Sequence, residues 1–247
     1  MSIQLKFVRI RTIIMQKNSS IRKLSIKGGI LAISLVLAIC YPHVLIKSFT
    51  YGLPFLKVYH LLWFFTVLIL VKRMIPRLNP RINLGKIYGR NYVQAGEDSN
   101  AKQKRLKDYI KKMNFGAVRS AVYWTLLVLD IGFWYIAGLL DPMWLIIIVI
   151  FFIFMDQFCI TVWCPFKTII QNKCCNTCRI NNWGYLMAFS PLIFIPSFWT
   201  YSILLLSVVI IIQWEYLYYK YPERFYELYN AKLMCKNCVN KCAKIRG

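Results

Sequence analysis

Residues 142–163, PMWLIIIVIFFIFMDQFCITVW, form an apolar run that contains a single charged residue, Asp156. A helix needs about 20 residues to cross the hydrocarbon core of a bilayer. This run is therefore long enough to form a transmembrane helix. Cys159 lies near its end, and Cys164 follows directly after it.

Five more apolar runs lie along the chain, at 29–48, 54–72, 119–140, 184–199 and 201–219. The 247 residues are 58% hydrophobic and only 17% charged, which is typical of a polytopic membrane protein and not of a soluble domain. The last two runs are short and are separated near Pro196–Thr200. We therefore expect an all-α bundle of six transmembrane helices, or five if 184–219 forms one long bent helix.

The distribution of basic residues predicts the orientation of these helices. With six spans and a cytoplasmic N-terminus, Lys47 and Lys57 alone fall outside, so 30 of the 32 Lys and Arg lie inside or at inner helix ends. This topology explains the net charge of +23, so no nucleic-acid partner is expected. Both termini are then cytoplasmic, in a multi-pass protein of a prokaryotic cytoplasmic membrane. Five spans would instead place the basic tail outside.

This topology divides the chain into seven segments. They are a basic cytoplasmic segment 1–28, the transmembrane hairpin 29–72, a basic cytoplasmic loop 73–118, the hairpin 119–163, a Cys-rich cytoplasmic loop 164–183, the hairpin 184–219 and a Cys-rich cytoplasmic tail 220–247. The first is interpreted as an unstructured tail or as an arm on the membrane surface. In the loop 73–118, Leu106, Tyr109, Ile110 and Met113 form one apolar helical face, which predicts an interfacial helix on anionic lipid, or a docking site for a soluble partner.

Eight of the nine cysteines fall at the cytoplasmic face in this topology: Cys159, Cys164, Cys174, Cys175, Cys178, Cys235, Cys238 and Cys242. That compartment is reducing, so metal binding or thiol redox chemistry is favoured over structural disulfides. The ninth, Cys40, is expected to be a packing residue in the first span.

Two C-x2-C pairs, Cys175–Cys178 and Cys235–Cys238, are typical of metal sites. The hairpin between them returns the chain to the same face, so the pairs can share one ion or cluster. Zinc and iron–sulfur both accept four thiolates. The C-x2-C-x3-C spacing at 235–242 matches part of a bacterial ferredoxin run and favours iron–sulfur, in one or two clusters. Structural zinc and metal-free thiols remain alternatives.

Residues 158–170, FCITVWCPFKTII, resemble the cysteine motif of polytopic iron–sulfur quinol dehydrogenases, the accessory proteins of periplasmic nitrate and nitrous oxide reduction. That family carries F-C-x3-C-P-F at the cytoplasmic end of a helix, followed by ferredoxin-like cysteines. This chain has four residues between Cys159 and Cys164 and lacks a complete ferredoxin domain. The resemblance implies membrane electron transfer and a quinone as redox partner.

Four polar residues within the expected spans are further site candidates. His43 and His60 flank the first outer turn at equal depth, where they could ligate a haem, take protons from a quinol, or simply be interfacial. Asp130 and Asp156 lie deep in the third and fourth spans, and ionisable groups there mark functional sites. For Asp156 the two interpretations are a proton relay beside a redox centre and an ion pair with a neighbouring helix.

The sequence therefore predicts a membrane electron-transfer protein, with the seven loop and tail cysteines as iron–sulfur ligands and Cys159 as a less certain one. It would exchange electrons with a quinone or a partner subunit, and its basic loops would dock an acidic redox partner. One alternative is a transporter or assembly scaffold whose loops are held by zinc. Another is a quinone-linked thiol oxidoreductase.

Overall fold

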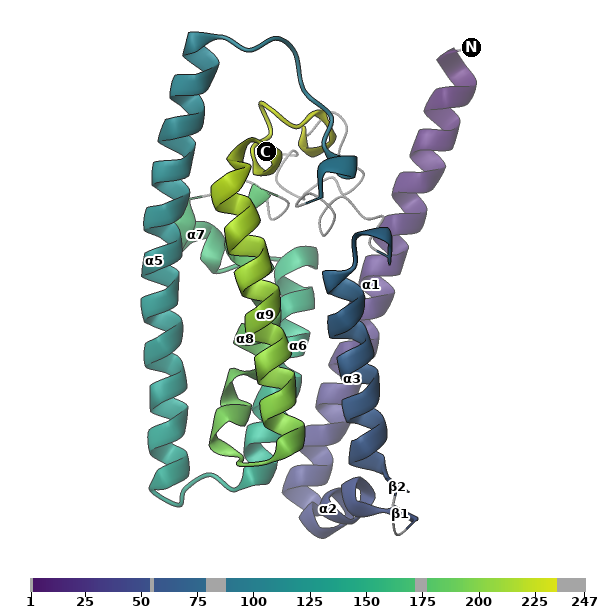
Figure 1. Cartoon of the computed structure of the whole chain (residues 1–247). Helices are drawn as coiled ribbons and strands as arrows, with labels where there is room; N and C mark the ends of the chain where they lie inside the picture. The colour runs from purple at the N-terminus through teal and green to yellow at the C-terminus, as the bar shows by residue number, and fades with distance from the viewer. Residues whose placement is uncertain (1, 54–55, 79–87, 172–176, 235–247) are drawn as a thin grey trace.

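A computed structural model describes residues 2–53, 56–78, 88–171 and 177–234. This part of the chain is mostly helical (Figure 1), with a two-residue antiparallel pairing of β1 and β2 and an isolated bridge between Gln94 and Asn230. The elements are α1 (Ser2–Cys40), α2 (Pro42–Thr50), β1 (Gly52–Leu53), β2 (Leu56–Lys57), α3 (Val58–Met74), η1 (Pro76–Leu78), η2 (Gly89–Asn91), α5 (Asn100–Ile136), α6 (Pro142–Thr161), α7 (Phe166–Ile170), η4 (Ile180–Asn182), α8 (Gly184–Phe189), η5 (Ser190–Phe194), α9 (Phe198–Lys220), η6 (Pro222–Phe225) and η7 (Ala231–Leu233).

Among the described residues, four helices are long and apolar enough to cross a membrane: Ser19–Cys40 within α1, and α5, α6 and α9. The helix α3 has 17 residues, and the apolar segment Gly184–Phe194, formed by α8 and η5, is shorter still. This agrees with the prediction of a helical membrane protein. The count of six spans stays a prediction.

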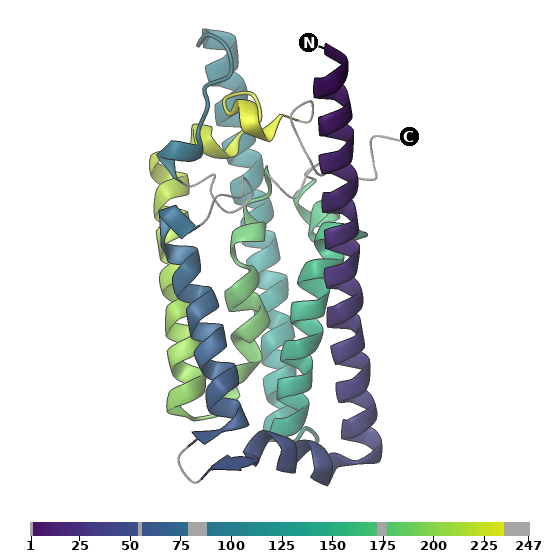
Figure 2. The same cartoon turned by 90° about the vertical axis from the view of Figure 1, so that its right-hand side faces the viewer.

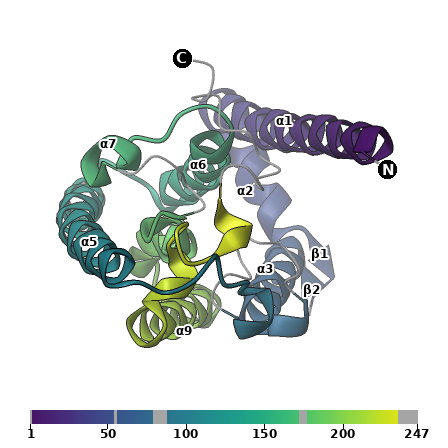
Figure 3. The same ribbon diagram turned by 90° about the horizontal axis from the view of Figure 1, so that it is seen from above.

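The long helices run side by side, and their packing leaves the short segment in the interior (Figures 1 and 3). The helix α1 packs on α6, while α3 packs on α9 and α5 contacts α7. The α8–η5 segment contacts α5, α6 and α9 and buries most of its apolar side chains. The break predicted near Pro196–Thr200 is present, because η5 ends at Phe194 and α9 begins at Phe198.

The first apolar run is divided differently from the prediction. A proline disfavours helical geometry in the residue before it, and Tyr41 leaves the helix directly before Pro42. The membrane-length segment is therefore Ser19–Cys40 and not 29–48, and α2 runs across the end of the bundle (Figure 2). The expected boundary at residue 28 falls inside α1. The backbone of the preceding segment is helical from Ser2, so this segment is not the unstructured tail that was one of the two interpretations.

The predicted interfacial helix is the first half of α5, which continues without a break into the apolar run that follows. Part of its apolar face packs against protein, and the contact of this helix with lipid stays a prediction. Tyr109 stacks on Tyr226 with ring centroids 4.2 Å apart, and Met113 is buried. The chain after α9 folds back onto α5, a long-range contact that a local helical pattern does not reveal.

The turn between α5 and α6 has the hydrogen bonds of a Schellman motif. Gly138 adopts a positive φ of 74°, and its N–H donates to the carbonyl of Tyr135. The N–H of Leu139 reaches back to the carbonyl of Trp134 at 3.0 Å. This turn ends α5 and lets α6 start at Pro142, where the sequence places the start of the fourth span.

Candidate functional site

A cavity of about 350 Å³ lies between α5, α6 and α8. We name it the thiol cavity, because Cys159, Cys164 and Cys178 contribute to its wall. The remainder of the wall is mostly apolar and rich in aromatic rings, including Trp124, Phe151, Phe152 and Phe166. Its volume lies in the range of small-molecule sites, and its lining suits a flat apolar ring better than a charged ligand.

The end of α6 brings two of these cysteines together. Cys159 occupies the last turns of α6, and Cys164 begins the turn into α7, where its carbonyl accepts from the N–H of Lys167 at 3.1 Å. The two thiols are hydrogen-bond partners. The position of α7 depends on Gly116 of α5, because a Cβ there would lie 2.9 Å from the Cα of Ile170.

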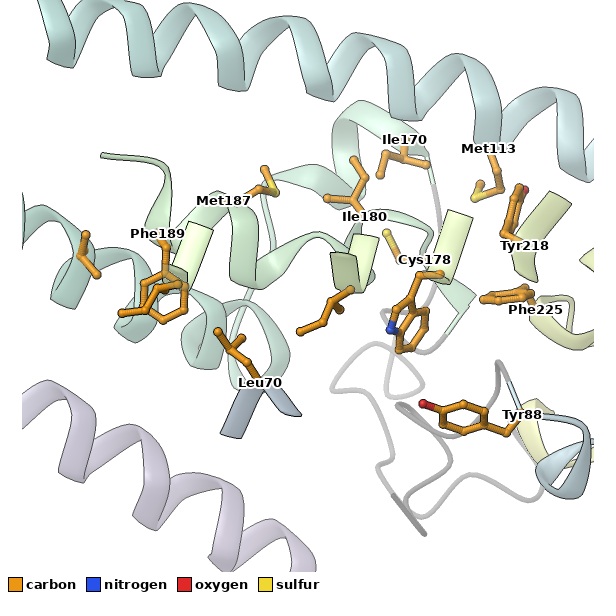
Figure 4. Close-up of a cluster of buried hydrophobic side chains, with 14 of the residues drawn as sticks. Leu70, Tyr88, Met113, Ile170, Cys178, Ile180, Met187, Phe189, Tyr218 and Phe225 are labelled. Atoms are coloured by element: carbon orange, nitrogen blue, oxygen red, sulfur yellow. The ribbon is translucent and has the colours of Figure 1, made fainter. Parts of the chain in front are cut away.

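The third cysteine, Cys178, is buried in the main hydrophobic cluster of the protein (Figure 4). The next residue, Arg179, forms an ion pair with Glu215 of α9. The indole N–H of Trp183 donates to the same carboxylate at 2.7 Å. These charge-assisted bonds have defined directions, so they fix the segment that carries Cys178 against α9.

A single hydroxyl connects this segment with the chain that leads to the C-terminal cysteines. The Tyr109 hydroxyl of α5 lies 2.6 Å from the carbonyl oxygen of Thr177 and 3.3 Å from that of Phe225. Phe225 belongs to the same buried cluster as Cys178. The described chain continues from there to Met234, immediately before Cys235.

The structure thus brings three of the eight predicted ligands to one cavity. The other five, Cys174, Cys175, Cys235, Cys238 and Cys242, lie outside the described residues. Within the described ranges, no group of three or more His, Cys, Asp or Glu side chains is arranged to hold a metal ion. The soft thiol donors of the cavity match the chemistry of iron–sulfur or zinc, but a complete ligand set requires cysteines from the two remaining segments.

Asp156 lies where the thiol cavity meets a second cavity of about 520 Å³. We name the second one the cationic cavity, because Lys23, Lys27 and Arg73 contribute to its wall. The charges of Lys27 on α1 and Arg73 on α3 attract the Asp156 carboxylate. Asp156 is exposed, but among the predicted intramembrane carboxylates it is the one that lines these two cavities between helices.

Asp130 differs from Asp156 in lining neither cavity. It is exposed on the outward face of α5, and its carboxylate accepts a hydrogen bond from the indole N–H of Trp134, one turn along the helix, at 3.2 Å. It lines neither of the two cavities.

The two histidines lie at the other end of the bundle and on different elements. His43 is exposed on α2, outside the membrane-length segment of α1. His60 lies in the first turn of α3, where its Nδ1 accepts from the N–H of Lys57 at 3.0 Å. Its ring also contacts Trp199 with centroids 4.6 Å apart. The observed role of His60 is thus to cap α3.

Sequence reasoning missed the residues that position the cysteines. Tyr109 is found only as part of an apolar face, and Glu215 as a carboxylate near the end of a span. Arg179 carries one local signal, since it follows directly after a C-x2-C pair. These three residues position the cysteine segments through contacts between residues that are 36 to 116 positions apart in the sequence.

Comparison with protein-family models, with curated proteins and with solved structures finds no match to this chain, so the resemblance of residues 158–170 to quinol dehydrogenases stays a prediction.

Proposed function

We propose that this chain is a multi-pass membrane redox protein whose cysteines ligate an iron–sulfur centre at one end of the bundle. The centre passes single electrons to or from a quinone or a partner subunit. Cys164 and Cys178 are ligands, together with cysteines of the segments 172–176 and 235–247, and Cys159 is an additional candidate ligand. An iron–sulfur centre supplies reversible one-electron chemistry.

The observation that carries this proposal is the position of the Tyr109 hydroxyl between Thr177 and Phe225. Thr177 follows the segment that contains Cys174 and Cys175, and Phe225 begins the chain leading to Cys235. Because both carbonyls lie within reach of one hydroxyl, the described segments that border the two C-x2-C pairs lie at one end of the bundle. Short connections then suffice to bring their thiolates to a common centre.

The proposed topology has six crossings with both termini in the cytoplasm of a prokaryote. In Figure 1, α1, α3, α5, α6, the α8–η5 segment and α9 alternate in direction along the bundle. This alternation places the start of α1 and the end of α9 at the same end, which we call the cysteine end. The basic residues of 1–28, 73–118 and 220–247 then face the cytoplasm, as the positive-inside rule requires.

A second candidate function is favoured by the thiol cavity itself. The hydrogen-bonded thiols of Cys159 and Cys164 lie beside an apolar, aromatic cavity that suits a quinone ring. Oxidation of two thiols to a disulfide releases two electrons and two protons, which reduce one quinone to its quinol. In this reading the protein is a quinone-linked thiol oxidoreductase, and Asp156 in the same wall is placed to accept a proton.

Anaerobic purification of the full chain, with analysis of iron, zinc and acid-labile sulfide and an absorption spectrum, tests the proposal. We expect iron with matching sulfide and a visible absorption that dithionite bleaches. The variant Cys178→Ser should lose most of this iron, whereas Cys40→Ser, which changes an exposed cysteine on α1, should retain it. Tyr109→Phe should lower the iron content, since it removes only the connecting hydroxyl.

The other outcomes separate the alternatives. Stoichiometric zinc without iron would contradict electron transfer and leave a zinc-stabilised transporter or scaffold. A metal-free protein that reduces an added quinone, and loses this activity in both Cys159→Ser and Cys164→Ser, would support the thiol oxidoreductase.

A further inference from the structure

The thiol cavity opens on the outer surface of the bundle between α5 and α6. Two apolar residues of its wall on α5, Tyr123 and Leu127, are exposed, and so are two on α6, Phe151 and Ile160. We call these four side chains the mouth of the cavity. Both helices are long and apolar enough to cross a membrane. In a bilayer the mouth therefore faces hydrocarbon and not water.

The helices on the two sides of the mouth are held in place by other elements. The helix α5 packs on α7 and η5, while α6 packs on α8 and η5. The half-buried ring of Trp124 reaches from α5 toward Phe152 of α6, with ring centroids 4.8 Å apart. The indole N–H of Trp124 donates to the Ser190 hydroxyl at 3.1 Å, which fixes the direction of the ring. A flat ligand that passes the mouth therefore meets a preformed aromatic wall.

The inner wall of the cavity differs from its mouth. Met187 and Ala188 of α8 line it and are buried, as is Cys178, a proposed ligand of the redox centre. The volume of about 350 Å³ lies near the lower end of the range for small-molecule sites. The cavity therefore has room for a substituted ring, whereas a long hydrocarbon tail on that ring stays outside the mouth, in the bilayer.

We propose that the thiol cavity is loaded from within the membrane, through the mouth between α5 and α6, by a quinone that carries a hydrocarbon tail. The ring packs against Trp124 and Phe152, and the tail passes through the mouth into the lipid. A ligand dissolved in the bilayer reaches this apolar wall without first entering water, where its apolar surface is unfavourable. The choice of a quinone among ring compounds rests on the redox function proposed for this chain, whereas the place of entry rests on the cavity.

Thermal unfolding of the full chain in vesicles of dioleoyl phosphatidylcholine tests the binding of the ring. Decylubiquinone is the probe, because its fully substituted ring has no free position for addition of a thiol. Decane, added at the same ratio to lipid, is the control for the tail alone. At a hundredfold excess over Kd we expect decylubiquinone to raise Tm by about 5–10 °C and decane to leave it unchanged.

Three variants test the place of entry. Leu127→Trp and Ile160→Trp narrow the mouth from α5 and from α6, and each should weaken binding of decylubiquinone by about tenfold or more, because the bound tail occupies the mouth. Leu129→Trp makes the same change at an exposed residue of α5 outside the cavity wall and should leave Kd unchanged. All three residues are exposed, so Tm without the probe should stay close to that of the wild type.

Two results would overturn the proposal. One is a Tm that decylubiquinone raises no more than decane does, since the cavity would then hold no quinone ring. The other is an equal Kd in Leu127→Trp, Ile160→Trp and Leu129→Trp, which would place the binding site elsewhere.

Failure of the proposed iron–sulfur centre gives a different result. A protein without iron that binds decylubiquinone, and loses this binding in the two mouth variants, would contradict the centre and support the entrance. A protein that contains iron and sulfide but does not respond to decylubiquinone would support the centre and contradict the entrance.

Discussion

The two ends of the helix bundle are held together by different interactions. At the cysteine end, the Arg179–Glu215 ion pair and the Tyr109 hydroxyl join segments far apart in sequence. At the opposite end, which carries β1 and β2, the rings of Trp63 and Trp199 lie 4.9 Å apart and the Trp63 indole N–H donates to the Ser202 hydroxyl at 2.7 Å, so these contacts join uncharged groups. Directional polar bonds fix loops in one arrangement, whereas ring packing tolerates small shifts. We therefore expect the stricter geometry at the end that carries Cys159, Cys164 and Cys178.

The largest effect is expected from breaking the ion pair. Glu215→Gln leaves the Arg179 guanidinium without its charged partner. A fully buried pair would lose 3–5 kcal/mol on such a change. The two side chains are 19% and 23% exposed, which reduces the expected loss to about 2 kcal/mol. We expect Tm to fall by about 4–8 °C and maleimide to label Cys178 faster.

The matched control is Glu97→Gln, which removes an exposed carboxylate and should change the free energy of unfolding by less than about 0.5 kcal/mol. An equal fall in Tm for both variants would show that the ion pair does not hold the Cys178 segment.

The next largest effect is expected from glycine substitutions in α5, which has one contact glycine toward each end of the bundle. A Cβ at Gly116 meets the backbone of Ile170 at 2.9 Å, so Gly116→Ala must displace α7 and the adjoining Cys164. A Cβ at Gly132 meets the tip of the Phe194 ring at 2.3 Å, and a ring can turn aside. We expect a loss of about 2 kcal/mol for Gly116→Ala and about 1 kcal/mol for Gly132→Ala, measured by thermal unfolding.

Gly29→Ala serves as the reference, because nothing lies within 4 Å of a Cβ there. It should gain up to about 1 kcal/mol through helix propensity. A larger loss at Gly132 than at Gly116 would reverse the proposed difference between the two ends.

A smaller effect is expected from His60→Leu at the opposite end. The change removes the acceptor for the Lys57 N–H, which costs about 1 kcal/mol. Tm should fall by a few degrees, while iron content and the labelling of Cys159 and Cys164 stay unchanged. His43→Leu, on the exposed surface of α2, should change neither Tm nor iron content. A loss of iron or of a haem spectrum in either variant would instead assign the histidines to a redox site.

The smallest effect concerns Asp98, an exposed carboxylate at the cysteine end, and the buried Tyr229. The Tyr229 hydroxyl donates to Asp98 at 2.8 Å, and this bond lowers the pKa of Asp98. Burial, with the Asp98 bond, raises the pKa of Tyr229 to about 12. The pair therefore stabilises the fold above the ordinary aspartate pKa of 3.8 and loses this contribution as pH falls through the lowered value.

Tm of the wild type and of Asp98→Asn, followed from neutral pH downward, measures this contribution. The difference between them should shrink below a pH of about 3.8. A difference in Tm between wild type and Asp98→Asn that stays constant at all pH values would show that the charge of Asp98 does not contribute to stability.

Much of the fold could be predicted from the sequence, because membrane helices are specified by long local apolar runs. The α5–α6 hairpin and the break before α9 follow from Gly138, Pro142 and Pro196. Even the end of α1 has a local cause, Pro42, although run length alone places it too late. The local pattern did not show where helices continue beyond the apolar runs, as at the start of α1 and of α5.

The candidate site divides in the same way. Cysteine spacing by itself indicates metal or thiol chemistry at one end of the bundle, since that chemistry depends on residue type and local spacing. The sequence offers both Asp130 and Asp156 as functional candidates within apolar runs. Only the tertiary structure decides that one faces outward while the other lies between two cavities. The orientation of a helix about its axis is set by its neighbours, and those contacts join residues distant in sequence.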